Sequence, residues 1–211
     1  GFAVALQEDF GQTLPCEATE YVQHIVDSAQ RMERLITDLL SYSRIARGRL
    51  SQRPLDLNDV FDDALALLER EIHSRNAVIR TPRSVCRVLG HEETLRQIFA
   101  NLLENAVKFV APDVRPEVDV EFAALQDGFV RIEVKDNGIG VPADGRERIF
   151  EVFERLHGIE TFPGTGIGLA IVSRGCQRLG GRCGVDSAPG QGSCFWVELP
   201  LPADPSPHEP R

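Results

Sequence analysis

Apolar residues recur with helical spacing over residues 17–46. They fall alternately three and four positions apart, the a/d pattern of a coiled coil or helical bundle, at Val22, Ile25, Ala29, Met32, Ile36 and Leu39. Three more apolar side chains widen this stripe, namely Val26, Leu35 and Leu40. With a shorter helical segment at residues 2–10 and a break at 11–15, the pattern predicts a helical hairpin. We expect the stripe to pair with a second copy; packing inside its own domain is the alternative.

Beyond a polar break at residues 48–54 the pattern changes to shorter, alternating elements. Apolar and polar residues alternate on both sides of the turn at 126–128, which predicts an antiparallel strand hairpin with one buried face. Other short strands are expected at residues 77–81, 85–89, 182–186 and 193–199, and helices at 57–73, at 92–110 and after Gly166. The whole set predicts an α+β fold, a helical hairpin followed by an α/β sandwich whose mixed sheet is covered by helices on one face.

These patterns divide the chain into three regions. The helical hairpin occupies residues 1–48, the sandwich 49–201, and a tail 202–211. The tail is rich in proline and has no apolar pattern, so we expect it to be disordered. Because Gly1 opens a segment with helical character, we expect the first helix of the hairpin to be truncated.

The charge balance narrows the possible partners. The chain has 23 Lys and Arg residues against 32 Asp and Glu residues, a formal net charge of −9, and no basic block. This disfavours binding to duplex nucleic acid or to an anionic membrane surface. No apolar run approaches the roughly 20 residues that span a bilayer, and no signal pattern opens the chain, so we expect a cytoplasmic segment. The five cysteines lack metal-site spacing and are expected to be reduced thiols.

The first segment with candidate chemistry is residues 101–109, NLLENAVKF. Asn101, Asn105 and Lys108 are spaced i, i+4 and i+7, so they share one face of the predicted helix. An amide oxygen suits Mg²⁺, and an ammonium group one turn away suits phosphate oxygens. A solvated polar helix face is the alternative interpretation.

The second segment, residues 134–142, is VKDNGIGVP, a strand that runs into a glycine-containing turn. Asp136 can accept a hydrogen bond from an exocyclic amino group, and Gly138 and Gly140 let a flat ring approach the backbone. The alternative is a simple turn, because Asp and Gly are ordinary turn residues.

The third segment, residues 164–171, is GTGIGLAI, a glycine-rich loop that leads into a helix. The free N–H groups at a helix N-terminus favour an anion such as a polyphosphate. The segment has neither the GxGxxG of a Rossmann fold nor the Lys-Ser/Thr of a P-loop.

Together, the order and spacing of these segments resemble the N, G1 and G2 boxes of the GHKL ATPase superfamily, and within it the sensor histidine kinases. Residues 149–158, IFEVFERLHG, look like the F box, and residues 190–195, GQGSCF, look like the final glycine box. The resemblance covers residues 55–201. Residues 21–44 are similar to the second helix of the dimerization and histidine phosphotransfer domain. The F box and the short lid after it look most like the phytochrome-type subgroup.

This resemblance implies a site for ATP and Mg²⁺. Asn105 would be the metal ligand, with Asn101 beside it. Lys108 and Arg155 would be the catalytic residues that contact phosphate, and Phe109 would pack by the adenine. Catalysis would consist mostly of positioning and charge neutralisation.

The resemblance also assigns roles within the two glycine-containing segments. Asp136 would accept the adenine amino group, with Gly138 and Gly140 letting the base approach. The triphosphate would be bordered by Gly164, Thr165, Gly166, Gly168 and Leu169. Residues 154–163 would be the mobile ATP lid. Implied partners are a second copy, bound through the hairpin, and the receiver domain of a response regulator.

The acceptor histidine that the resemblance calls for is not recognisable. No His-Asp/Glu-Leu motif precedes the break at residues 11–15, and none of the five histidines has that context. We therefore expect the chain to bind ATP without phosphorylating itself, the acceptor lying outside it.

Two other functions remain open at this level. The first is a degenerate kinase-like module that binds a nucleotide without transferring its phosphate. The second is a GHKL ATPase of another kind, such as a chaperone or a mismatch-repair protein. The heptad helix before the ATPase-like region and the short lid favour the kinase.

Overall fold

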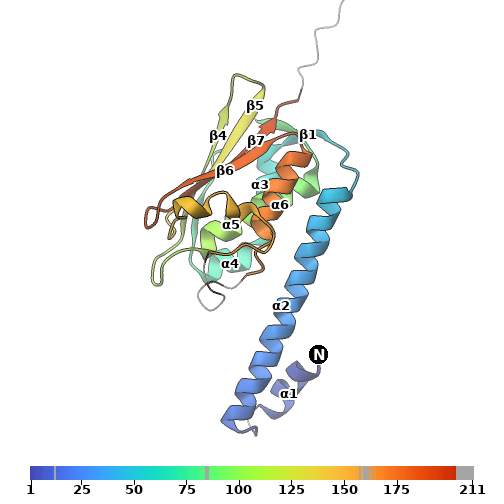
Figure 1. The fold of residues 1–211 in the computed structure, drawn as a ribbon, viewed down its shortest axis with the longest axis vertical. Helices are drawn as coiled ribbons and strands as arrows, with labels where there is room; N and C mark the ends of the chain where they lie inside the picture. Colours follow the sequence, from blue (N-terminus) through green and yellow to red (C-terminus); the bar gives the residue numbers. More distant parts are fainter. Residues whose placement is uncertain (12, 84–85, 157, 159–161, 163, 203–211) are drawn as a thin grey trace, which may run out of the picture.

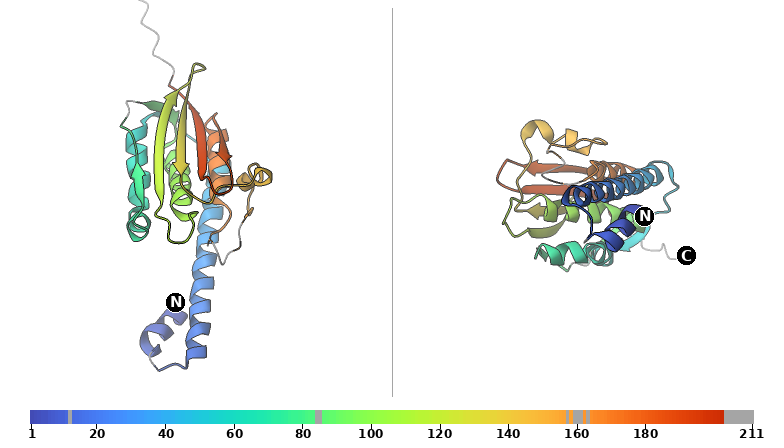
Figure 2. Two further views of the ribbon diagram at one scale, coloured as in Figure 1. Left: turned by 90° about the vertical axis from the view of Figure 1, so that its left-hand side faces the viewer. Right: turned by 90° about the horizontal axis from the view of Figure 1, so that it is seen from below.

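The N-terminal hairpin consists of α1 (Phe2–Phe10) and the much longer α2 (Cys16–Arg47). The computed structural model describes residues 1–11, 13–83, 86–156, 158, 162 and 164–202. In it, α1 folds back on the far end of α2, where Gln7 donates a hydrogen bond to Gln23 (Figure 1). Figure 2 shows that the N-terminal part of α2 extends away from the globular part of the chain.

Most of the predicted apolar stripe on α2 is exposed in this single chain. Val22 and Val26 are buried, whereas Ile25, Met32, Ile36 and Leu39 expose about half or more of their surface. The short α1 therefore covers only one end of the stripe.

The globular part is a sandwich of helices and a mixed sheet. Its helices are α3 (Leu57–Leu67), α4 (Glu69–Ser74), α5 (Glu92–Lys108) and α6 (Gly168–Arg178), with 3₁₀ turns at Ala143–Gly145 and Arg148–Phe150. The main sheet has the order β2-β4-β5-β7-β6, formed by Val78–Arg80, Glu117–Ala124, Phe129–Asp136, Ser193–Pro200 and Arg182–Ser187. In this sheet, as far as the structure describes it, β2 and β4 pair in parallel and the other three pairs are antiparallel.

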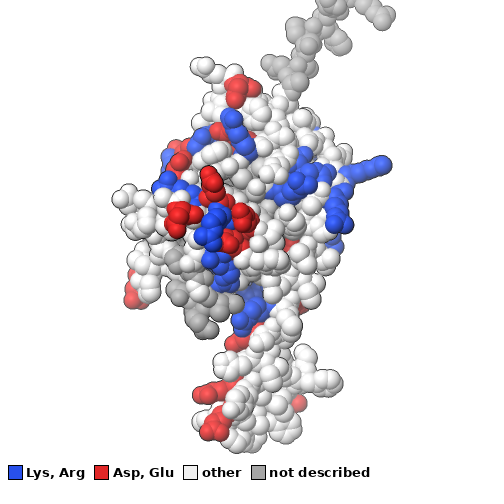
Figure 3. Space-filling view, viewed as in Figure 1, with Lys and Arg blue, Asp and Glu red and all other residues white. Residues whose placement is uncertain are grey.

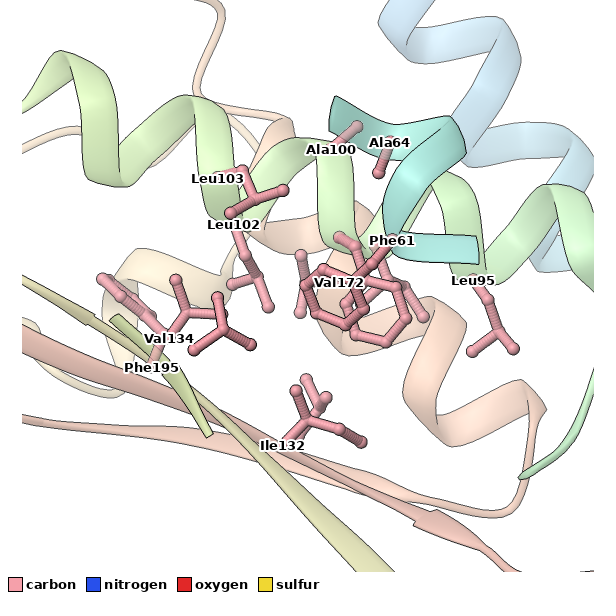
Figure 4. Close-up of a cluster of buried hydrophobic side chains, with 14 of the residues drawn as sticks. Phe61, Ala64, Leu95, Ala100, Leu102, Leu103, Ile132, Val134, Val172 and Phe195 are labelled. Atoms are coloured by element: carbon pink, nitrogen blue, oxygen red, sulfur yellow. The ribbon is translucent and has the colours of Figure 1, made fainter. Parts of the chain in front are cut away.

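The core lies between one face of this sheet and the helices. Alternate residues of β5, including Ile132 and Val134, point inward and meet Leu102 of α5, Phe61 of α3 and Val172 of α6 (Figure 4). The opposite face of β5 carries Arg131, Glu133 and Lys135, as expected for a sheet with one buried face. The predicted fold class is therefore confirmed.

Two local predictions were wrong. Residues 53 and 54 were assigned to a polar break, but β1 (Arg53–Asp56) pairs with β3 (Arg87–Gly90) in a separate two-stranded sheet. The single helix expected at residues 57–73 is interrupted at Leu68, between α3 and α4. The expected strand start at Val85, and the tail from residue 203 onward, lie outside the described residues.

Helix α2 is attached to the sandwich through α6. Ile45 of α2 packs with Ile167 and Ile171 in a small buried cluster. At the end of α2, the Arg178 guanidinium donates hydrogen bonds to the backbone carbonyls of Ile45, Ala46 and Gly48. These carbonyls have no partner within the helix, so the side chain satisfies them. The hairpin is thereby held against the globular part.

Candidate functional site

Nearly all the expected site residues line one cavity of about 380 Å³. They come from α5 and the residue that follows it, the end of β5, the turn after β5, the segment between the 3₁₀ turn Arg148–Phe150 and α6, and the start of α6. The expected residues that line it are Asn101, Asn105, Lys108, Phe109, Asp136, Gly140, Arg155, Gly164, Thr165, Gly166, Gly168 and Leu169. Of the expected set, Gly138 alone is not part of the lining.

Helix α5 contributes a polar face to the cavity. His91 accepts a hydrogen bond from the Thr94 amide and so caps the helix start. Asn101 donates to the Gln97 carbonyl over 2.8 Å, which leaves its Oδ1 directed toward Gly168. A Cβ atom on Gly168 would lie only 2.7 Å from that oxygen, so α6 can start here only with glycine or after a local shift.

Lys108 is a partly desolvated cation at the end of α5. Its ammonium nitrogen lies 4.7 Å from the centre of the Phe109 ring. Burial lowers the pKa of Lys108, and the charges of Arg155 and Arg34 lower it further, whereas Glu104 acts in the opposite direction. An anion in the cavity would relieve this crowding of positive charge.

Asp136 is held at the end of β5 by two backbone donors. The amides of Gly138 and Ser193 both donate to its Oδ1, over 2.9 and 3.0 Å. Among the described residues, none donates a hydrogen bond to Oδ2. Burial raises the pKa of Asp136 to about 6 and outweighs the two hydrogen bonds. The second oxygen can therefore accept a hydrogen bond from a ligand.

The glycines after Asp136 have backbone neighbours that exclude a side chain. A Cβ atom on Gly138 would collide with the Phe109 carbonyl oxygen. Gly140 has a φ of +75°, and a Cβ atom there would collide with the Ala188 carbonyl oxygen. The structure thus supplies a packing reason for both glycines, and their role toward a bound base stays a prediction.

Hydrogen bonds join the glycine-rich loop to Arg155 and to helix α2. Arg155 donates hydrogen bonds to the backbone carbonyls of Phe162 and Gly164, and the Thr165 hydroxyl donates to Asp38 of α2. Gly166, with a φ of +73°, accepts a hydrogen bond from the Phe153 amide. Parts of the lid expected at residues 154–163, namely 157, 159–161 and 163, lie outside the described residues.

Sequence reasoning missed several residues of the cavity. Arg34 and Asp38 come from α2, more than 120 positions away from the glycine loop along the chain. Glu104 and Gln97 lie on the predicted helix face without having been singled out. The i, i+4 spacing of Arg34 and Asp38 beside the apolar stripe was the available signal. Glu154, Leu156 and Phe162 belong to the expected lid, without a role of their own having been predicted. The other lining residues that were not singled out are Ile139, Val141, Ile149, Ser193 and Phe195.

Comparison with known proteins is consistent with this geometry. Residues 90–203 match the family described as histidine kinase-, DNA gyrase B-, and HSP90-like ATPase, and residues 1–48 match the His Kinase A (phospho-acceptor) domain. Over 93% of its own length, the present chain is 33% identical to the phytochrome-like protein Cph1 of Synechocystis. Over 79% of its own length, it is 39% identical to the sensor histidine kinase AruS of Pseudomonas aeruginosa.

Solved structures show the same arrangement. Full-length ShkA, crystallised in complex with AMPPNP, matches 91% of this chain with a TM-score of 0.69 and 34% identity, over 40% of its own chain. The chain spans only 26% of Cph1 and 18% of AruS. It combines an ATPase-family domain with a preceding phospho-acceptor-type helical region. The chain therefore belongs to the histidine kinase-, DNA gyrase B-, and HSP90-like ATPase family, and within it to the sensor histidine kinases.

Proposed function

We propose that this chain is the catalytic portion of a two-component sensor histidine kinase. It binds Mg-ATP, and the γ-phosphoryl group passes to a histidine outside the chain and then to an aspartate of a response regulator. The observation that carries the proposal is the convergence of three separate motif segments on one cavity. The complex of ShkA with AMPPNP, an ATP analogue, supports a nucleotide as the occupant.

The roles proposed for the base-binding residues follow their contacts. Asp136 accepts the adenine amino group on Oδ2, because Oδ1 is occupied by two backbone amides. Phe109 packs beside the base; its ring now lies 5.1 Å from that of Phe162. Gly138 and Gly140 keep the turn close to Phe109 and Ala188.

The phosphate end is assigned to the cations and the glycine loop. Lys108 and Arg155 are the proposed catalytic residues, because they bring positive charge to the cavity. Gly164, Thr165, Gly166, Gly168 and Leu169 border the triphosphate at the N-terminus of α6.

A magnesium ion fits the donors that are present. Among the described residues, no three His, Cys, Asp or Glu side chains gather as a metal site. A single amide oxygen from Asn105, with Asn101 nearby, suits Mg²⁺, which in such sites is completed by substrate phosphates and water. The ion would supply charge neutralisation at the phosphates.

An acceptor histidine outside this chain is proposed because none of the five histidines stands in a His-Asp/Glu-Leu motif. His24 is exposed on α2, His73 lies on α4 and His91 caps α5; none of these three lines the cavity. His157 and His208 lie outside the described residues.

Domain ranges and partners complete the proposal. Residues 1–48 form the dimerization and phosphotransfer helices, 49–201 the ATP-binding catalytic domain, and 202–211 a tail. In the intact protein, two copies pair through the hairpin, and a receiver domain binds; no nucleic acid or membrane contact is assigned to this segment, which we place in the cytoplasm. Within the described ranges, no helix has the length and apolarity needed to cross a membrane.

Calorimetric titration of Mg-ATP into the chain and into Asp136→Asn tests the nucleotide site. We expect binding by the wild type and its loss in the variant, because an Asn side chain that keeps its oxygen toward Gly138 and Ser193 presents an N–H₂ donor to the adenine amino group. Absence of binding by the wild type would contradict the proposal.

Incubation with labelled ATP and a separately supplied histidine-containing helix distinguishes a kinase from the alternatives. Acid-labile label on the added helix is expected. Binding without transfer would identify a nucleotide-dependent binding module, and steady hydrolysis without an acceptor would identify another kind of GHKL ATPase.

Asn105→Ala tests the metal assignment. Removal of the amide oxygen should abolish the Mg²⁺-dependent part of ATP affinity while the fold survives, because Asn105 is only half-buried. Titrations with Mg²⁺ and with EDTA measure this part. Equal Mg²⁺ dependence in wild type and variant would exclude Asn105 as the ligand.

A further inference from the structure

One face of α2 runs along the sandwich and ends in the cavity. Arg34, Asp38, Tyr42 and Ile45 are spaced i, i+4, i+8 and i+11, so they share a face of the helix. Tyr42 and Ile45 belong to the apolar cluster around Ile167 that attaches α2 to α6. The two polar positions of the same face, Arg34 and Asp38, line the cavity.

Asp38 fixes this end of the face relative to the glycine loop. Its carboxylate accepts a hydrogen bond from the hydroxyl of Thr165, which follows Gly164. The side chain of Arg34 starts one helical turn before Asp38. Arg34 is close enough to the end of α5 for its charge to act on both Lys108 and Glu104.

The cations of the cavity differ in what they already bind. Arg155 donates to two loop carbonyls, so part of its guanidinium is committed to protein. Within the described part of the chain, the Arg34 side chain makes one hydrogen bond, a weak one from Nε to the Gln30 carbonyl over 3.4 Å. Among the described residues, no acidic group forms an ion pair with Arg34, whereas Glu154 pairs with Arg148.

In the face drawn in Figure 3, basic side chains lie where α2 meets the globular part, and acidic side chains lie toward the far end of the hairpin. A guanidinium with free terminal N–H groups is suited to paired hydrogen bonds with phosphate oxygens. We propose that Arg34 positions the polyphosphate of the bound nucleotide, so that α2 completes the phosphate end of the site. This inference rests on the proposed function in one respect only, that the cavity takes a nucleoside polyphosphate.

The test compares Mg-ATP, Mg-ADP and adenosine as calorimetric ligands of the full chain. Arg34→Gln should weaken ATP binding about tenfold or more, weaken ADP binding less, and leave adenosine binding unchanged, because the lost contacts are to phosphate. Arg34→Lys should recover part of the ATP affinity, since it keeps the charge without the planar guanidinium. The matched control is Arg44→Gln, which removes an exposed arginine of α2 outside the cavity lining and should change none of the three affinities.

The graded dependence on phosphate number is what a merely structural role would not produce. An equal loss for all three ligands in Arg34→Gln, or no loss for any, would overturn the inference while the wild type still binds ATP. A wild type that binds none of the ligands would overturn the proposed function, and this inference with it.

Discussion

Two opposing effects act on the carboxyl group of Asp136: backbone hydrogen bonds orient it, and burial disfavours its charged form. Its Oδ1 is tied to two backbone amides, which fixes the direction of Oδ2. Burial nevertheless raises the pKa of Asp136 from 3.8 to about 6, so the charged form is held at a cost in folding. A residue that is favourable for binding a base is therefore unfavourable for the stability of the empty protein.

Asp136→Asn should make the nucleotide-free chain more stable at pH 7.5, by about 3 kcal/mol, because the variant has no charge to bury. The pKa is higher in the folded state than in the unfolded state, so the cost to the wild type is complete above pH 6 and fades as the pH falls toward 4. The gain should therefore shrink over that interval. Urea denaturation at several pH values measures it.

Asp63→Asn is the matched control, because Asp63 is an exposed carboxylate on α3. It should change the free energy of unfolding by little at any pH. A gain from Asp136→Asn that does not depend on pH would contradict the explanation.

The sequence predicts a site residue when the pattern that identifies it lies within one short segment of the chain. Asn101, Asn105 and Lys108 share a helix face through spacing alone, and the cavity lining brings them together with Asp136. The second amide on Asp136 comes from Ser193, 57 positions further along the chain, and no local pattern indicates it. Site roles for the bound nucleotide remain predictions, because they depend on a ligand.

At the scale of elements, the attachment of α2 to α6 depends more on the hydrogen bonds of one side chain, Arg178, than on the apolar surface buried between the two helices. Arg178 lies at the end of α6 and satisfies three carbonyls at the end of α2. Helix ends of this kind otherwise need water or a glycine cap. The apolar contribution is small, because among the described residues this cluster contains three buried side chains, Ile45, Ile167 and Ile171, and a few partly buried ones.

Arg178→Gln should loosen the last turn of α2 without unfolding the sandwich. Amide hydrogen exchange at residues 44–48 should become about tenfold faster, while exchange in β5 and β7 stays the same. Arg174→Gln, one turn earlier on α6, is the control, since its side chain contacts Gln177 of its own helix. Equal exchange rates in the two variants would refute a capping role.

Element prediction failed where a strand is short and polar. In β1, Arg53, Pro54 and Asp56 leave Leu55 as the one fully buried position, and no alternation can be detected over four residues. The strand exists because it pairs with β3, a partner more than 30 positions away. Long elements such as α5 were predictable because their periodicity extends over several turns.

At the scale of the whole molecule, the exposed stripe on α2 contrasts with the well-buried core. Ile36 exposes 61% of its surface and Met32 59%, although both belong to the heptad pattern. A contiguous apolar surface of this kind marks an association site. The pattern that predicted the helix therefore also predicts what the helix does in an assembly.

Ile36→Glu should weaken self-association of the chain at least tenfold without lowering the stability of the single chain, because Ile36 is exposed within it. Sedimentation equilibrium at several concentrations measures the dissociation constant. Leu67→Glu, which alters an equally exposed apolar side chain on α3, should leave association unchanged. A wild type that stays monomeric, or equal effects of both changes, would contradict pairing through α2.

The hydrogen bond between Thr165 and Asp38 has a thermodynamic consequence. It joins a loop that borders the nucleotide cavity to a helix that carries the association stripe. If nucleotide binding changes the strength of that bond, the free energy of the contact between α2 and the globular part must change by the same amount. Conversely, a change in that contact must change the nucleotide affinity by the same free energy. The nucleotide affinity and the stability of the contact between α2 and the globular part then report the same coupling free energy. Measuring how either one responds to the other is enough to determine it.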